Sequence, residues 1–204
     1  MTTWGDYRSC ERSLGIPGAD TPPRLLPYPD PCRPVRLLFI GGNPPCPGGG
    51  FWSRDDDRLL RSLHAIFLDL EWATADSPAP FREEFRQHGF HFIHAVKCFS
   101  TPRHPSAALV RTCALAHLRE DLEHLRPERI CLLGQVPFRA VKACDAEHLR
   151  RSFARQETTL SICGADVPML VTYSPNDRRQ SRADRRIASR RDGEDGRLSE
   201  HPRP

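Results

Sequence analysis

An asparagine at the end of an apolar run is the residue whose type and position most favour chemistry. It lies in the stretch LLFIGGNPPCPGGGFW, residues 37–52, where a glycine pair precedes Asn43 and two prolines follow it. The glycines allow backbone angles that other residues resist, and Pro44 and Pro45 fix the path of the chain. A stiff support of this kind is what a catalytic or ligand-reading side chain requires. Three further glycines and two aromatic residues then predict a bare wall followed by a flat apolar wall.

A glycine-rich loop after a strand is also typical of nucleotide binding. This loop, however, contains neither G-K-[ST] nor GxGxxG, and its prolines lack the N–H groups that a phosphate-binding nest needs. The sequence therefore argues against a nucleoside triphosphatase. A turn with a purely structural role is the alternative that remains open, because glycine and proline are common in turns.

Four short apolar runs predict strands that are buried on both faces of a sheet. They cover residues 35–40, 90–96, 129–133 and 167–173.

Helical patterns separate these runs. The first spans residues 53–70, with Ser53 as its predicted N-cap and three aspartates in its first turn. The second spans residues 106–125, and the third begins near residues 136–137 and continues to about Phe153. Strands that alternate with helices form a parallel sheet with right-handed crossovers. The sequence therefore predicts one α/β domain with three layers, in which a mostly parallel four-stranded sheet carries helices on both faces.

Ligands of such sheets bind beyond the carboxyl ends of the strands. The candidate chemistry therefore lies at four strand exits, which are residues 41–51, 94–105, 134–136 and 173–179.

The length of 204 residues suits a single domain. We expect an irregular N-terminal arm over residues 1–34, which is rich in proline, glycine and charge and should contribute no core. The domain itself should span residues 35–190, and a disordered polar and basic tail should span residues 191–204. No apolar stretch approaches the roughly 18 residues that a membrane span needs. We therefore expect a cytoplasmic monomer with no membrane partner.

The charge of the chain is unevenly distributed. The net charge is +4, and residues 177–204 hold nine Arg against six Asp and Glu. This skew favours a polyanionic partner such as nucleic acid, although a solvated arginine-rich tail explains it equally well.

Five segments, in order from about Arg36 to Arg179, resemble the motifs of the uracil-DNA glycosylase superfamily. The first is closest to the mismatch-specific type and the middle segment to the iron–sulfur type. The segments are GGNPP with its following Gly and Phe, FHFIHAVKC, STPRHPSAALVRTCALAHL, LRPERICLLGQVPFRAV and VTYSPNDR.

The resemblance implies an enzyme that excises a damaged base from DNA. Asn43 falls where the mismatch-specific members orient the attacking water, and Phe51 falls near the aromatic that stacks on the extruded base. Gly42 and Pro44 belong to the same base-binding loop. Arg178 and Arg179 follow the last motif, where a loop of the superfamily enters the DNA minor groove.

The sequence departs from the superfamily pattern at two strand exits. His94 replaces the asparagine that reads uracil, so the preferred base is open. Ser174 and Asn176 replace the His and Ser of the last motif, so we expect weaker catalysis. A literal HPS occurs at residues 104–106, but Ser106 is expected to cap a helix, so we interpret it as a decoy.

The resemblance also suggests a structural [4Fe–4S] cluster, although the chemistry itself requires no cofactor. Cys98 and Cys113 match two of the ligands in iron–sulfur members, and the arm offers Cys10 and Cys32 in place of a C-x-x-C pair. Eight cysteines in a cytoplasmic protein are otherwise expected to be free thiols.

Three functions follow as hypotheses. The first is a DNA glycosylase for uracil or a related deaminated base, acting in base-excision repair. The second is a non-catalytic nucleic-acid-binding protein on the same fold. The third is a protein that binds a free nucleobase or nucleoside.

Overall fold

The structure is a computed structural model. It describes residues 7–8, 10–12, 14–19, 27–47, 49–100, 104–144, 149, 153 and 155–176.

The described residues contain one five-stranded sheet with the order β2-β1-β3-β5-β4. All neighbours pair in parallel except β4 and β5, which form an antiparallel hairpin at one edge. The α/β class and the mostly parallel sheet are therefore confirmed, with one strand more than predicted. The bounds are β1 (Leu37–Gly41), β2 (Phe90–His94), β3 (Ile130–Leu133), β4 (Gln156–Ile162) and β5 (Ala165–Thr172).

The unpredicted strand β4 has an alternating pattern of buried and exposed residues instead of a continuous apolar run. A strand on the edge of a sheet can expose one face, so a search for strands buried on both faces does not find it. Cys163 and Gly164 connect β4 to β5 with φ of 49° and 79°. Two residues with positive φ are what a tight hairpin turn between twisted strands requires.

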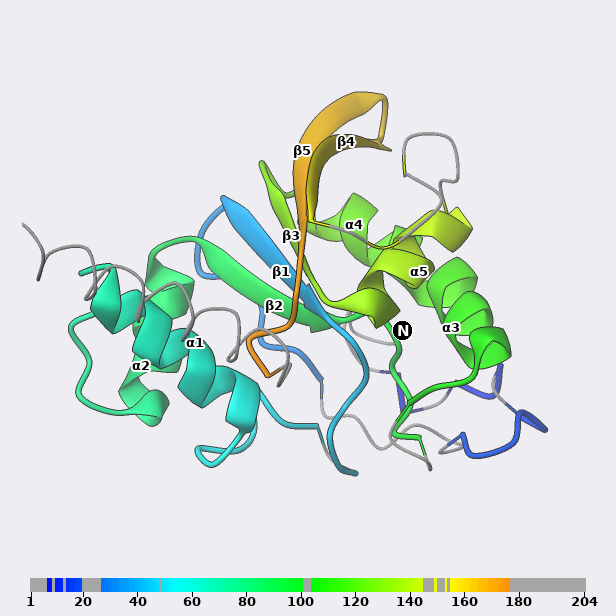
Figure 1. Ribbon diagram of the computed structural model, residues 1–204, viewed down its shortest axis with the longest axis horizontal. Coiled ribbons are helices and arrows are strands. Elements are labelled where there is room, and N and C mark those ends of the chain that lie inside the picture. The colour runs from blue at the N-terminus through cyan, green and yellow to red at the C-terminus, as the bar shows by residue number, and fades with distance from the viewer. Residues whose placement is uncertain are drawn as a thin grey trace, which may run out of the picture.

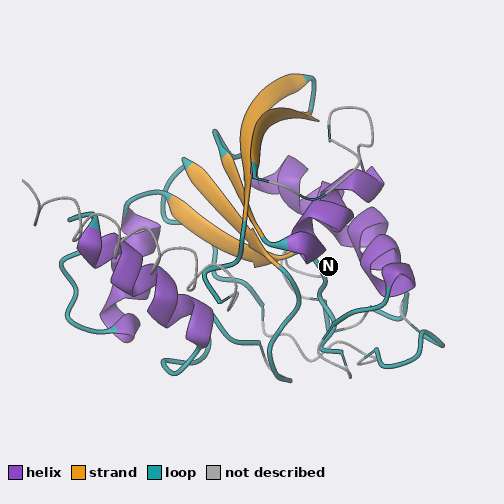
Figure 2. Ribbon diagram, viewed as in Figure 1, coloured by secondary structure: helices purple, strands orange, loops and turns teal. Residues whose placement is uncertain are grey.

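Helices cover both faces of the sheet (Figures 1 and 2). On one face lie α1 (Arg58–Asp69) and α2 (Pro78–Gln87). On the other lie α3 (Ala107–Cys113), the π-helical segment η1 (Ala114–Leu118), α4 (Arg119–Leu125) and α5 (Gln135–Cys144).

Strand β1 shows how the sequence divides the core into two layers. Leu38 and Ile40 are fully buried on the face of α3 to α5. Phe39, between them, packs into an aromatic cluster beneath α1 and α2. Because successive side chains of a strand point to opposite faces, a run of apolar residues supplies both layers at once.

The helices differ from the predicted ones in two limits and in one additional helix. Helix α1 begins at Arg58 instead of near Ser53, because the buried Asp57 carboxylate accepts the backbone N–H of Leu60 at 2.9 Å and caps the helix. The predicted third helix ends at Cys144 instead of near Phe153. Helix α2, with proline in its first turn, was not predicted. The predicted cap of the 106–125 helix is confirmed.

The N-terminal arm contributes more to the core than we predicted. Tyr7 and Tyr28 are 8% and 5% exposed and pack with the α3 to α5 layer. Each is a large aromatic residue, and burial of its ring offsets the cost of ordering an irregular segment. Residues 178–179 and 191–204 lie outside the described residues, so the limits of the domain and tail remain predictions.

Within the part of the chain that is described, no helix has the length and apolar character needed to span a bilayer.

Candidate active site

A cavity of about 320 Å³ opens where the parallel strands end. Its walls come from the exits of β1, β2, β3 and β5, as expected for a parallel sheet. Six of the seven residues predicted for catalysis or base binding line it, and they are Gly42, Asn43, Phe51, His94, Ser174 and Asn176.

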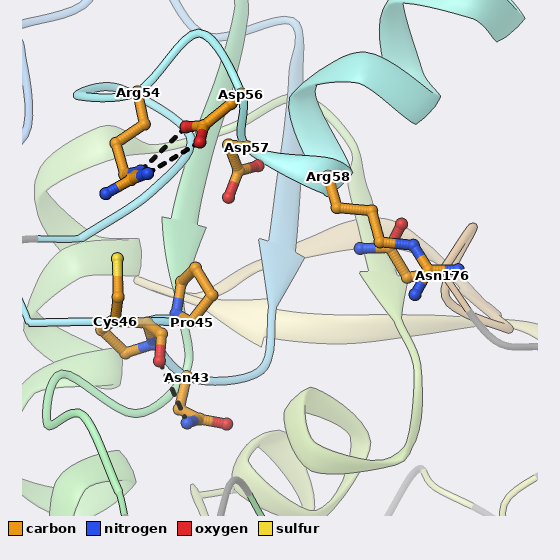
Figure 3. Close-up of a pocket in the computed structure, with 9 residues that line it drawn as sticks. Asn43, Pro45, Cys46, Arg54, Asp56, Asp57, Arg58 and Asn176 are labelled. Carbon is orange, nitrogen blue, oxygen red and sulfur yellow. Dashed lines mark hydrogen bonds and ion pairs between the residues drawn. The ribbon is translucent and has the colours of Figure 1, made fainter.

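A second cavity has a volume of about 530 Å³, and Figure 3 shows the residues that line it. The seventh predicted residue, Pro44, lines this one. The two cavities share five lining residues and so adjoin each other, with Asn43 at their junction. The shared residues are Asn43, Pro45, Asp57, Arg58 and Asn176.

The Asn43 amide is held by two weak hydrogen bonds. Its Nδ2 donates to the carbonyl of Pro44 and to the Ser100 hydroxyl, at 3.3 Å each, which is long for such contacts. Its Oδ1 makes no hydrogen bond within the described residues. The acceptor end of the amide is therefore available to a water or ligand in the cavity.

The aromatic wall consists of Phe51 and Phe92. Their rings are stacked with centroids 4.6 Å apart, and Phe51 is only 1% exposed. A Cβ atom at Gly41 would lie 2.7 Å from the Phe92 ring, so glycine is required for this close approach. Trp52 does not line the cavity, because its Nε1 donates to the Phe92 carbonyl at 2.8 Å and its ring lies over His91.

His94 is buried at the end of β2, with 4% of its surface exposed. Its Nδ1 lies 3.3 Å from the Tyr28 hydroxyl, and its ring meets the Phe92 ring edge-on at 4.9 Å. Burial, and then the charge of Lys97, lower the pKa of His94 to about 3. The imidazole is therefore neutral at physiological pH, with one nitrogen that donates and one that accepts.

The last motif presents a second amide, that of Asn176, to the two cavities that Asn43 also lines. The Ser62 hydroxyl donates to Asn176 Oδ1 at 3.1 Å, and the Asn176 backbone N–H donates to Ser174 Oγ at 3.3 Å. The Asn176 Nδ2 has no hydrogen-bond partner in the described ranges. The resemblance places Ser174 at the position of the motif histidine, and Asn176 presents unpaired N–H groups at the cavity.

The sequence analysis missed two charged residues at the start of α1. Asp57 is 8% exposed, and burial raises the pKa of its carboxyl group above the ordinary value. Arg58 is exposed, and its side chain makes no hydrogen bond or ion pair within the described residues. Both stand in a run of charged residues, and nothing in that run distinguishes them from Asp55 or Asp56.

The HPS segment is only partly a decoy. Ser106 caps α3 by accepting the backbone N–H of Leu109 at 3.2 Å, as expected. His104, however, lines the 320 Å³ cavity. Its position two residues before a helix cap gave no signal, because the sequence pattern does not show on which side of the chain an isolated histidine lies.

The cysteines suggested for an iron–sulfur cluster do not converge as a set of four. Cys10, Cys98 and Cys113 surround a small space with His117, whereas the exposed Cys32 thiol lies 3.9 Å from a Glu83 carboxylate oxygen. A hydrogen bond with Cys98, followed by burial, raises the pKa of the Cys113 thiol well above its usual range.

The described part of the chain contains no group of three or more His, Cys, Asp or Glu side chains arranged to hold a metal ion. The described residues therefore do not fit the cluster, which remains a prediction of the resemblance.

Comparison with known families identifies the class of protein. The model of the uracil DNA glycosylase superfamily matches residues 29–192. The chain therefore belongs to this superfamily, and the resemblance seen in the five sequence segments is confirmed. A search of curated proteins found no match.

Proposed function

We propose that the protein is a DNA glycosylase that hydrolyses the N-glycosidic bond of a flipped-out deaminated base such as uracil. Membership of the superfamily supports base excision in general. The observation that carries the proposal is the cavity that joins the Asn43 amide, the Phe51 ring and His94 at the carboxyl edge of the sheet. Its volume of about 320 Å³ is within the range of small-ligand pockets.

The arrangement suits the two charges that develop as the bond breaks. A base that leaves the duplex stacks against an aromatic face and is read at its polar edge. Positive charge grows on the sugar and negative charge on the leaving base. Asn43 Oδ1 would hold the attacking water, and Asp57 would stabilise the sugar cation. His94, His104 and Asn176 would donate hydrogen bonds to the base.

The experiment is excision from oligonucleotides that contain one uracil, hypoxanthine or xanthine, in single and double strands. Release of any of these bases, detected as strand cleavage at the abasic site, supports the proposal. Absence of excision across the panel, with retention on DNA, would instead indicate the second function, a non-catalytic DNA-binding protein. The loss of the motif histidine at Ser174 is the observation that favours that alternative.

The variant Asp57→Asn tests whether the Asp57 carboxylate only caps α1 or also stabilises the sugar cation. Asparagine is as good a helix cap as aspartate, so the free energy of unfolding should change little. If the negative charge stabilises the sugar cation, the single-turnover excision rate should fall by about 10- to 100-fold, because a charge aimed at the transition state is lost. Asp56→Asn is the matched control, since Asp56 is exposed and paired with Arg54 at 2.7 Å. If Asp57→Asn had full excision activity, Asp57 would serve only as the N-cap of α1.

Arg58→Gln should weaken DNA binding. Arg58 is an exposed cation at the rim of both cavities without an ion-pair partner in the described residues, so we assign it a DNA phosphate. Loss of one phosphate contact should reduce the slope of log affinity against log salt by about one. Fluorescence anisotropy at several salt concentrations measures this slope, and an unchanged slope would remove Arg58 from the interface. The resemblance also places Arg178 and Arg179 at DNA. Their contributions to the salt dependence of DNA binding can be measured in the same way.

A further inference from the structure

Three of the four cysteines suggested as cluster ligands surround a space that is too small for a cluster. Cys10, Cys98 and Cys113 line this space together with His117, and its volume is about 10 Å³. A cavity of roughly this volume is needed to hold a single water molecule. A cluster of iron and sulfide ions is much larger than one water, so the four side chains would have to move apart to hold it.

The ligand atoms of these side chains contact one another and the backbone. Cys10 Sγ lies 3.0 Å from His117 Nε2. Cys113 Sγ accepts the backbone N–H of Lys97 at 3.0 Å and is hydrogen-bonded with Cys98. A metal ion would have to replace each of these contacts.

No further cysteine is placed to complete the set of ligands. All eight cysteines of the chain lie in the described residues, and none forms a disulfide. The Cys32 thiol lies 3.9 Å from Glu83 of α2, and α2 covers the opposite face of the sheet from α3 (Figure 1). The remaining four do not line the space, and they are Cys46, Cys131, Cys144 and Cys163. The fold therefore gathers three thiols and not four.

A buried ion pair next to these thiols holds the N-terminal arm. Lys97 Nζ lies 2.5 Å from Asp121 Oδ2, and the two side chains are 0% and 2% exposed. The Tyr7 hydroxyl donates to the other oxygen of Asp121. The Lys97 ammonium lies 4.9 Å from the centre of the Tyr7 ring and 5.1 Å from that of the Tyr28 ring, which is within the range of cation–π attraction. Both tyrosines belong to the arm, so the ion pair binds the arm to the domain.

The arm also contacts the backbone at the candidate active site. The Tyr28 oxygen accepts the backbone N–H of His94 at 2.8 Å. Ala19 forms an isolated β-bridge with Ser100, whose hydroxyl accepts a hydrogen bond from the Asn43 amide. A secure attachment of the arm therefore supports two residues that line the cavity.

We propose that the protein folds without an iron–sulfur cluster, and that the contacts of Tyr7 and Tyr28 with the Lys97–Asp121 ion pair fasten the arm instead. The resemblance implies that in iron–sulfur members a cluster joins cysteines of the arm to cysteines that flank the segment after the second strand. Here hydrogen bonds and buried charge join the arm to the same region. The inference concerns how the arm is held, so it stands or falls independently of base excision.

Metal analysis of the full-length protein is the first test. The protein is expressed with added iron and purified without oxygen. We expect iron, zinc and sulfide each well below one per chain, and no increase after anaerobic incubation with ferrous iron and sulfide followed by gel filtration. The urea midpoint of unfolding should be the same with and without a chelator. Stoichiometric metal before or after this incubation, or a midpoint that the chelator lowers, would overturn the inference.

The variant Tyr7→Phe tests the attachment of the arm, because it keeps the buried ring and removes the hydroxyl that binds Asp121. Trypsin can cleave the arm after Arg8 and Arg12, and the rate of such cleavage follows the population of the open form. We expect cleavage about 10-fold faster than in the wild type, in line with the loss of one hydrogen bond to a charged group. An unchanged rate would overturn the role of Tyr7.

The variant Cys10→Ser is the matched control in the same segment of the arm. Serine can still contact His117, so cleavage by trypsin should stay close to the wild-type rate. If a cluster held the arm, loss of a thiolate ligand would release it. A larger effect of Cys10→Ser than of Tyr7→Phe would therefore show that the thiols fasten the arm, and it would refute the proposal.

Discussion

We expect Asn43→Ala to lower the single-turnover rate of base excision by about 100- to 1,000-fold, the loss typical of one preorganised polar group at a reacting centre. The physical reason is the position of the amide at the junction of the two cavities, with Oδ1 unpaired within the described residues. Its two hydrogen bonds are both 3.3 Å long, so their loss should cost little stability. DNA affinity should also change little, because no charge is removed.

Two further variants sharpen this prediction. Asn43→Asp keeps the size of the side chain and provides a stronger acceptor for the attacking water, so it should retain far more activity than the alanine variant. Ser100→Ala removes one of the two partners that hold the Asn43 amide and should have a much smaller effect. Excision by Asn43→Ala at the wild-type rate would remove Asn43 from the mechanism.

The largest effect on stability is expected for Lys97→Met, which should lower the free energy of unfolding by about 3–5 kcal/mol. Lys97 and Asp121 are 0% and 2% exposed, so removal of the ammonium leaves a buried carboxylate without its counter-charge. The carbonyl of His94 also loses a donor. Urea denaturation monitored by tryptophan fluorescence measures the change.

The double variant Lys97→Met/Asp121→Leu is the decisive control, because it removes both buried charges together. It should recover much of the lost stability, since replacing a buried ion pair by apolar residues is often close to neutral. Arg54→Met, which breaks the exposed pair with Asp56, should leave the unfolding free energy nearly unchanged. A Lys97→Met protein as stable as the wild type would show that Asp121 is compensated without Lys97.

The charge of Lys97 persists across the physiological range of pH. Burial is the largest single influence and lowers the pKa of Lys97, but the charge and hydrogen bond of Asp121, together with Tyr28 and Cys113, outweigh it and raise the pKa above its ordinary value of 10.5. A folded-state pKa above the unfolded one stabilises the folded protein at all lower pH values. This contribution is therefore complete at neutral pH and is lost only as the pH rises through the alkaline range.

The elements that carry the site were predictable because their signals are local. Continuous apolar runs indicated β1, β2, β3 and β5, and the exits of parallel strands must meet at one edge of a sheet. The glycine and proline pattern around Asn43 likewise indicated a stiff loop at that edge. These features depend on neighbouring residues alone, so the sequence was sufficient to predict them.

The parts that were not predicted depend on contacts between distant residues. Tyr28 meets His94 across 66 positions, and Lys97, in the loop after β2, is paired with a carboxylate on helix α4. His104 lines the cavity although its neighbours in the sequence do not indicate this, and Asp57 differs from Asp55 and Asp56 in being buried and capping α1. Hydrophobic periodicity cannot predict these contacts, because it shows which face of a helix or strand is apolar but not which polar side chains meet.

The glycine before Phe51 is a spatial requirement and not a source of flexibility. A Cβ atom at Gly50 would lie 2.5 Å from Asp57 Oδ2 and 2.8 Å from the Pro45 ring. The loop that holds Asn43 and the start of α1 thus touch through a position with no room for a methyl group. Protein engineers who replace loop glycines with alanine to stiffen a chain would at this position force apart the two walls that the glycine allows to meet.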